Sequence, residues 1–228
     1  MKKEIILLSI GGSLVVPDGI DKDFLSQFKK LILQYTRKGK RFVITVGGGT
    51  TCRIYQDASR DLGNPTLTEL DWLGIKVTEV NAYLLKMLFE PHVHPKVITN
   101  PTENIRFTKS VLIGAGWKPG CSTDMDAVLL SRKLGIHRLV NLTNIDFVYD
   151  KDPRKWSDAK PIHSISWKEF RKIIPAKWQP GLHSPFDPVA SRLAQKIKLE
   201  VTIMNGKDIA NLDNYLSGRD FKGTQIHS

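Results

Sequence analysis

The sequence of 228 residues contains no apolar run of about 18 residues, the length that a helix needs to cross a membrane. It contains two cysteines, Cys52 and Cys121, and neither stands in a CxxC or Cys/His pattern typical of a metal site. The short apolar stretch 5–10 has no cleavage site after it, which indicates a strand and not a signal peptide. We therefore expect a cytoplasmic protein with reduced thiols, no resident metal site and no membrane partner.

Motifs of several common enzyme classes are also missing. No GxxxxGK[ST] sequence is present, which excludes a P-loop enzyme, and no GxSxG or histidine-centred pattern points to a nucleophilic serine. The stretch 114–120, GAGWKPG, is one residue away from the dinucleotide-binding fingerprint but lies in the middle of the chain. A nicotinamide-dependent oxidoreductase therefore stays a minor alternative.

Positive charge, by contrast, is in excess: 34 lysines and arginines against 23 acidic residues give a formal net charge of +11. A surplus of this kind suits an anionic partner such as a nucleotide or a phosphate. The basic residues are scattered, and no aromatic and basic motif typical of RNA recognition is present. Phosphate chemistry on small molecules is favoured over nucleic-acid binding.

Apolar runs of strand type alternate with stretches of helical periodicity along the whole chain. We predict strands at 4–10, 41–46, 94–99, 110–116, 137–143 and 199–205, and a loop rich in Asp, Lys and Pro up to about 163. Helices are predicted at 21–38, 66–89, 123–134, 166–174, 187–197 and 207–217, with Gly39 and Gly135 as helix ends. This alternation predicts a single α/β domain, a three-layer sandwich with a mainly parallel central sheet.

The longest predicted helix, 66–89, carries an apolar stripe. Its members recur at helical spacing and are Leu67, Leu70, Leu73, Val77, Val80, Leu84 and Leu88. Burial inside one subunit and burial at an interface between subunits both explain such a stripe.

Three predicted strands end in glycine-rich segments: Gly11-Gly12-Ser13, Gly47-Gly48-Gly49, and the loop 114–124. In a parallel sheet, ligands bind outside the carboxyl ends of the strands. Glycine lets an anion approach the backbone amides closely, and the third loop also runs into the start of a helix. Three such ends in a basic protein predict a polyphosphate ligand.

A fourth segment, 141–153, follows the strand 137–143 and contains Thr143, Asn144, Tyr149 and Asp152. Polar groups at a strand end can hydrogen-bond a base or a ribose, or hold Mg²⁺ near phosphates. An Asx-rich surface turn that ends at a proline is the alternative interpretation.

Taken in order, these segments resemble the amino acid kinase superfamily, and within it the uridylate kinases of the archaeal type. The resemblance rests on IGGSLVVPDGID near the start, VGGGTTCRIY, TELDWLGIKVTEVNAYLL and GCSTDMDAVLLSRKLG. It continues with TNIDFVYDKDP, HSPFDPVASRLAQK (183–196) and GTQI near the end. The likeness covers nearly the whole chain in the correct order.

The resemblance implies transfer of the γ-phosphoryl group of ATP to UMP, with Mg²⁺ carried by ATP. It implies an acceptor-binding part at about 1–135, an ATP-binding part at about 136–228, and a homo-oligomer, typically a hexamer. The residues implied to bind ATP are Gly11, Gly12, Ser13, Gly49, Arg53, Thr143, Asn144, Tyr149 and Asp152. Those implied to bind UMP are Gly48, Asp71, Gly116, Trp117, Lys118, Pro119, Gly120, Cys121, Ser122 and Thr123.

Catalysis is expected from Arg53, whose guanidinium can hold phosphate oxygens, and from Lys118 in the loop 114–124, which the resemblance places around the acceptor UMP. Three positions depart from the superfamily pattern: Ser9 and Asn141 stand where lysines are common, and Phe147 replaces a glycine. These departures keep two alternatives open. One is a kinase of the same fold with another acceptor, an amino acid or a small phosphorylated alcohol. The other is a nucleotide-binding regulator with weak activity.

Overall fold

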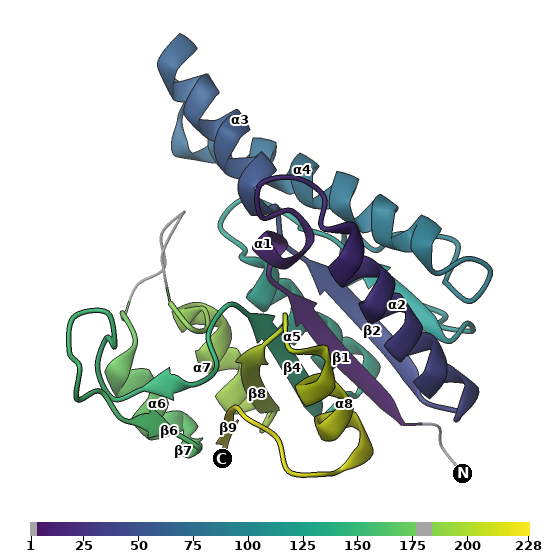
Figure 1. Ribbon diagram of the computed structural model, residues 1–228. Helices are drawn as coiled ribbons and strands as arrows, with labels where there is room; N and C mark the ends of the chain where they lie inside the picture. The colour runs from purple at the N-terminus through teal and green to yellow at the C-terminus, as the bar shows by residue number, and fades with distance from the viewer. Residues whose placement is uncertain (1–3, 177–183) are drawn as a thin grey trace.

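The computed structural model describes residues 4–176 and 184–228 (Figure 1). Its main sheet has seven strands in the order β3-β2-β1-β4-β8-β9-β7. The strands are β1 (Ile5–Ile10), β2 (Arg41–Val46), β3 (Val111–Gly114), β4 (Arg138–Thr143), β7 (Ser164–Ser166), β8 (Glu200–Asn205) and β9 (Thr224–His227). From β3 to β8 the neighbours are parallel, and β9 is antiparallel to β8. The predicted mainly parallel sheet is confirmed.

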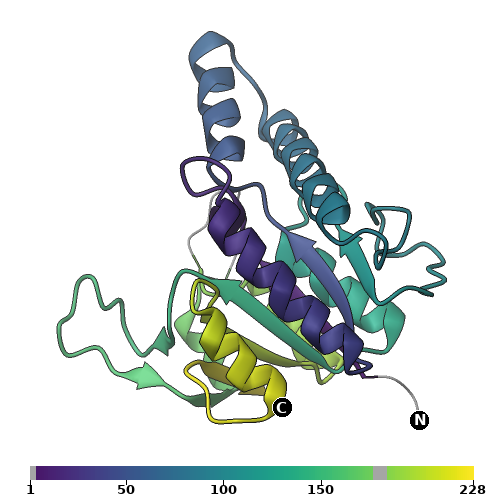
Figure 2. The same cartoon turned by 45° about the vertical axis from the view of Figure 1, so that its right-hand side comes forward.

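The helices are α1 (Gly12–Val15), α2 (Lys22–Arg37), α3 (Gly49–Leu62), α4 (Leu67–Leu88), α5 (Thr123–Leu134), α6 (Trp167–Ile173), α7 (Pro188–Lys196) and α8 (Ile209–Ser217). One face of the sheet packs against α2, α4 and α8 in a core that includes Phe28, Leu85 and Leu212. The opposite face packs against α5, α6 and α7, with Trp167 and Phe186 fully buried. The three-layer sandwich is therefore confirmed, and Figure 2 shows α2 and α8 in front of the sheet.

Local sequence signals account for the helix ends. Asp21 and Ser122 cap the starts of α2 and α5 by accepting hydrogen bonds from backbone N–H groups three residues on. Gly39 and Gly135, the predicted helix stops, have positive φ angles of 89° and 64°. Because side chains disfavour that conformation, glycine ends a helix there at little cost.

Two predicted elements differ from the structure. Residues 94–99 form no strand; Val93 and Ile98 make isolated bridges to Val111 and Gly114. Pro95 has no N–H to donate, and this segment lies at the outer edge beside β3, so a continuous ladder is not formed. The predicted loop before 163 contains the short strands β5 (Val148–Tyr149) and β6 (Pro161–Ile162), which pair as an antiparallel hairpin.

The predicted stripe of α4 is wrong in part. Leu70 and Val77 are buried, but Leu67 and Val80 expose 67% and 68% of their surface. The buried face runs instead through Leu70, Gly74, Ile75, Val77, Thr78, Asn81, Ala82 and Leu85. This helix is thus apolar on its inner and its outer side, a pattern that periodicity alone cannot separate into two faces.

Helix α3 extends away from the sheet and lies beside α4 (Figures 1 and 2). It has no buried residue. In the part of the chain that the structure describes, no helix is both long and apolar enough to cross a membrane.

Candidate active site

The ends of the parallel strands bring the glycine-rich segments to one edge of the sheet. Ile10 at the end of β1 pairs with Val46 of β2 on one side and with Leu142 of β4 on the other. Thr45 pairs with Gly114 at the end of β3. The segments after β1, β2, β3 and β4, predicted separately from the sequence, are therefore neighbours in space.

The loops after β1 and β2 touch backbone to backbone. A Cβ atom at Gly12 would overlap the amide nitrogen of Gly49 and lie 2.5 Å from the carbonyl carbon of Gly47. Gly49 has a φ of 67°, and a Cβ there would lie 2.5 Å from the Gly12 carbonyl oxygen. Glycine at these positions is thus required by contact between the two loops, a reason that the sequence does not reveal.

The first loop is also tied to β4. The Gly11 N–H donates to the carbonyl oxygen of Leu142 at 2.8 Å. Ser13 lies within α1, directly after Gly12. At the end of β4 the Thr143 hydroxyl lies 3.4 Å from the Asn144 side-chain oxygen, and both residues have accessible side chains. Polar groups from β1 and β4 therefore border the same edge.

Asn81 of α4 supports the second glycine loop and was not predicted from the sequence. Its Nδ2 donates to the carbonyl oxygens of Gly47 at 2.9 Å and Gly48 at 3.2 Å. Asn81 is 5% exposed. The signal that would have found it is a polar residue on the buried face of a helix, since such a group needs a partner.

Arg53 lies in α3, one turn after Gly49, and is exposed. Its Nη2 donates to the Thr50 hydroxyl at 2.6 Å. That hydroxyl donates in turn to the carbonyl oxygen of Pro17 in the loop after α1. The guanidinium is thereby held beside the two glycine loops, although the side chain as a whole is exposed.

The loop 115–122 joins β3 to α5 and is held by three side chains. Thr78 Oγ1 accepts from Gly116 N at 2.8 Å, and Asp71 Oδ2 accepts from Gly120 N at 3.0 Å. The third, Asp126 Oδ2, accepts from Trp117 N at 3.2 Å. Thr78 and Asp126 were not predicted from the sequence. Asp71, predicted to contact UMP, faces this acceptor loop from α4.

Within the acceptor loop, the Lys118 ammonium lies 4.0 Å from the centre of the Trp117 ring. Trp117, Pro119 and Cys121 are half-buried, while Lys118 and Gly120 are exposed. Burial raises the pKa of the Cys121 thiol. Ser122 and Thr123, also predicted to bind the acceptor, form the start of α5 directly after the loop.

Two acidic residues lie in the first turn of α5, Asp124 against β1 and Asp126 against the acceptor loop. Asp124 accepts a 3.5 Å hydrogen bond from the Ser9 hydroxyl and one of 3.0 Å from the Asp187 N–H. Burial raises the pKa of Asp124 to about 7, and burial together with the charge of Asp124 raises that of Asp126 to about 8. In residues 4–176 and 184–228, neither carboxyl group has an ion pair with a lysine or an arginine.

The two positions where lysine is common in the superfamily hold small polar groups. Ser9 is 2% exposed on β1, and the Asn141 amide of β4 donates to the carbonyl oxygen of Pro185 at 3.1 Å. His183, the first residue of the motif 183–196, lies outside the described residues. Phe147 packs its ring edge-on against His163, with the ring centres 4.9 Å apart.

The structure does not bring Asp152 to the glycine loops. Asp152 lies in the segment between β5 and β6, which extends away from the sheet (Figure 2). Its carboxylate pairs with Arg154, which lowers the pKa of Asp152. Tyr149 forms part of β5 at the base of the same hairpin.

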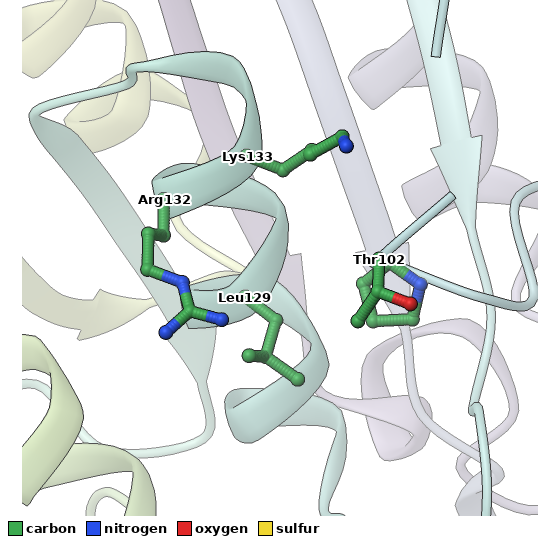
Figure 3. Close-up of a pocket in the computed structure, with 5 residues that line it drawn as sticks. Thr102, Leu129, Arg132 and Lys133 are labelled. Atoms are coloured by element: carbon green, nitrogen blue, oxygen red, sulfur yellow. The ribbon is translucent and has the colours of Figure 1, made fainter. Parts of the chain in front are cut away.

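A surface pocket of about 330 Å³ lies apart from this edge. Figure 3 shows Arg132 and Lys133 projecting from α5 near Thr102, with Leu129 on the same helix. These basic residues belong to the last turn of α5, whereas the acceptor loop meets its first turn. Among the described residues, no group of three His, Cys, Asp or Glu side chains could hold a metal ion.

Comparisons with known proteins identify the family and agree with the fold. Residues 4–205 match the family model described as the amino acid kinase family. A uridylate kinase of Methanobrevibacter smithii is 32% identical over 98% of this chain and 99% of its own length, and one of Sulfurisphaera tokodaii is 33% identical over 94% and 96%. The crystal structure of uridylate kinase from Archaeoglobus fulgidus matches with a TM-score of 0.83 and 27% identity, covering 97% of this chain and 99% of that one.

Proposed function

This chain belongs to the amino acid kinase family, and we propose that it is a UMP kinase, which transfers the γ-phosphoryl group of ATP to UMP. The observation that carries the proposal is the full-length likeness to curated uridylate kinases, which extends over all the segments of the candidate site. The neighbouring strand-end loops support it, since two nucleotides must meet for direct transfer.

On the ATP side, we propose that the backbone of Gly11, Gly12, Ser13 and Gly49 meets the phosphates. The contact between the first two glycine loops supports this assignment, because it gathers amide groups from two strands at one place. Thr143, Asn144, Tyr149 and Asp152 are proposed to hold the nucleoside. For Asp152 this requires the hairpin of β5 and β6 to approach the sheet edge when ATP is bound.

On the UMP side, we propose that the acceptor is held by Gly48, Asp71, residues 116–122 of the acceptor loop, and Thr123. The hydrogen bond of Asp71 to Gly120 supports a shared role, since it connects α4 with that loop. Trp117 offers an aromatic face for stacking on the base. These assignments match the proposed acceptor-binding part at about 1–135, with the ATP nucleoside in the part at about 136–228.

The reaction needs no strong base, because the acceptor phosphate of UMP is already an anion at neutral pH. One of its oxygens attacks the γ-phosphorus of ATP while the bond to the β–γ bridging oxygen breaks, and ADP leaves. The enzyme must align two polyanions and offset the charge on the transferred oxygens. Arg53 and Lys118 are the proposed catalytic cations, and Mg²⁺ enters as part of the substrate MgATP.

The raised pKa values of Asp124 and Asp126 fit a site for polyanions. A protonated carboxyl group repels phosphate less than a carboxylate does, so these acids weaken the field of Arg53 and Lys118 less than their number suggests. The family lysines are absent at Ser9 and Asn141, and Asp124 beside Ser9 has no ion pair in the part of the chain that the structure describes. The negative charge near β1 is therefore smaller than the number of acidic residues in the sequence implies.

We further propose a cytoplasmic homo-oligomer, with a hexamer as the family-based expectation. The exposed apolar side chains of α3 and α4 support association, and include Leu62, Leu67, Val80, Tyr83 and Met87. Exposed apolar surface on this scale is typical of a protein interface.

An assay of ADP release tests the reaction. Purified protein with MgATP is given UMP, CMP, AMP, glutamate or isopentenyl phosphate in separate reactions. We expect ADP release with UMP at a rate far above the others. Turnover with glutamate or isopentenyl phosphate alone would assign another acceptor, and ATP binding without turnover on any acceptor would indicate a regulator.

A further inference from the structure

Asp126 stands out among the three side chains that hold the acceptor loop. Thr78 and Asp71 are contributed by α4, whereas Asp126 belongs to α5 and fixes Trp117 from the other side. Asp126 is fully buried, and its Oδ1 has no hydrogen-bond partner within the described residues. The Trp117 amide is therefore the one group to which this carboxyl is hydrogen-bonded in that part of the chain.

A carboxyl group in such a place is costly. The charged and titratable groups near it are Asp124 on the same helix and Cys121 of the acceptor loop. Within the described residues, no lysine or arginine forms an ion pair with Asp126. Burying an acid without a cation is unfavourable, and an apolar residue of the same size would fit more cheaply. An apolar residue could not make the hydrogen bond to the Trp117 amide, which is the interaction that Asp126 contributes.

The position of the Trp117 amide affects both the Trp117 ring and the Lys118 ammonium. Gly116 before it is packed against Thr78 and Ile75 of α4, so the loop has little freedom on that side. The Trp117 ring carries the Lys118 ammonium at 4.0 Å, which makes the position of this cation depend on the conformation at residue 117. An anchor at the Trp117 amide thus fixes an aromatic face and a positive charge together.

We propose that Asp126 is a positioning residue of the acceptor site, which holds the Trp117 amide and so sets the geometry of Trp117 and Lys118 toward the acceptor. This proposal rests on the proposed function for its kinetic consequence. Its structural part does not, since the hydrogen bond between Asp126 and the Trp117 amide is observed directly in the chain. Asp126 itself does not touch the reacting atoms.

Four variants test this proposal. Asp126→Asn keeps a side-chain oxygen that can accept the hydrogen bond from the Trp117 amide, and Asp126→Ala and Asp126→Leu remove it. Ser131→Ala is the control. Leucine suits an apolar environment and keeps the test usable if the alanine variant folds poorly. Ser131 is buried on the same helix, and its hydroxyl has no partner in the described residues, so its loss perturbs the core without touching the acceptor loop. ADP release with UMP is measured for the wild-type protein and for each variant.

We expect Asp126→Ala and Asp126→Leu to raise KM for UMP about tenfold, with KM for ATP within about twofold, because a lost hydrogen bond of this kind is worth about 1.4 kcal/mol. Asp126→Asn and Ser131→Ala should stay within about threefold for both substrates. Equal changes in both KM values, or no rescue by asparagine, would overturn the proposal.

Hydrogen–deuterium exchange on the ligand-free protein separates this proposal from the proposed function. The peptide containing residues 115–122 should exchange faster in Asp126→Ala and Asp126→Leu than in wild type, with Asp126→Asn and Ser131→Ala unchanged. Unchanged exchange in the alanine and leucine variants would refute the positioning role even if UMP is phosphorylated. Faster exchange in a protein that fails to turn over UMP would support the positioning role and refute the proposed function.

Discussion

Arg53 is exposed on α3, yet one of its guanidinium nitrogens is held by Thr50 beside the two glycine loops. The side chain is therefore held in place, while its guanidinium makes no other hydrogen bond within residues 4–176 and 184–228. A planar guanidinium can hold two phosphate oxygens at once, which a solvated point charge cannot do as well. With serine at position 9 and asparagine at 141, we propose that Arg53 supplies much of the positive charge needed in the transition state.

Replacement of Arg53 by alanine should lower kcat about 100-fold or more, the loss typical when one charge-stabilising group is removed from a transition state. Arg60→Ala is the matched control, because Arg60 lies two turns further along α3 and pairs with Asp57. Steady-state kinetics with saturating MgATP and UMP give the comparison. A rate near that of wild type for Arg53→Ala would remove Arg53 from the catalytic site.

The buried acid Asp126 predicts how stability depends on pH. Its pKa is about 8 in the folded chain and near 4 in the unfolded chain, so the folded state binds the extra proton between these values. Stability from this group is therefore present at low pH and is lost as the pH rises toward 8, by up to about 1.4 kcal/mol per pH unit.

Urea denaturation at pH 5.5, 7.0 and 8.5 measures this effect. Asp126→Asn should show a smaller fall in the unfolding free energy than wild type over that range. Asp124, whose pKa is also raised, leaves part of the slope in place. Parallel curves for the two proteins would show that Asp126 does not titrate as expected.

At the scale of the elements, the glycine loops after β1 and β2 form one unit. Asn81 holds the second loop through two carbonyl oxygens, and Gly12 packs against its backbone. An added methyl group at position 12 has no flexible side chain to displace, so the two strand ends must separate. Overpacking of this kind destabilises a protein by about 1–3 kcal/mol.

Gly12→Ala should therefore lower the unfolding free energy by about 1–3 kcal/mol and abolish most activity. Gly19→Ala is the control, since a Cβ atom at Gly19 would meet nothing within 4 Å. Thermal melts and ADP release report on the two effects. A Gly12→Ala protein as stable and as active as the control would contradict the close packing of the loops.

Several features of this arrangement could be predicted from the sequence, and others could not. Runs such as 41–46 and stops such as Gly39 are local signals, and they predicted the strands and helix ends well. The contact of Gly12 with Gly47 and Gly49 joins residues more than 30 positions apart, which no local pattern encodes. The resemblance placed the loops at one site, but it did not indicate Asn81 or Asp126.

The failures in α4 and at 94–99 have a common cause. Helix α4 has apolar residues on two sides, and 94–99 has the residues of a short strand. In both cases the neighbouring elements decide which side is buried or whether a ladder forms. Leu67 and Val80 face outward because Leu70, Ala82 and Leu85 already fill the inner face. The segment 94–99 lies at the sheet edge with a proline that cannot donate, so it makes bridges in place of a ladder.

At the scale of the whole molecule, the exposed apolar surface is concentrated on α3 and α4. Val80, Tyr83 and Met87 expose 68%, 54% and 66% of their surface on one helix, and Leu62 at the end of α3 exposes 89%. Large apolar side chains gathered on one projecting pair of helices are costly in water. We expect a second copy of the chain to cover them.

Val80→Glu should shift the protein toward a smaller species in size-exclusion chromatography with light scattering, because a buried charge at an interface is unfavourable. Ile173→Glu is the control, since Ile173 exposes 42% of its surface on α6, on another part of the molecule. A monomeric wild-type protein, or an identical mass for Val80→Glu and wild type, would contradict an interface at α4.

The backbone contact between the loops after β1 and β2 has a consequence for affinity. Since ATP is proposed to meet the first loop and Gly49, and UMP to meet Gly48, neither nucleotide can move the loop that it contacts without moving the loop that the other nucleotide contacts. The two binding events then share one free energy of loop ordering, and whichever nucleotide binds first lowers the cost for the second. Such coupling is reciprocal, so UMP must tighten ATP binding by the same factor by which ATP tightens UMP binding.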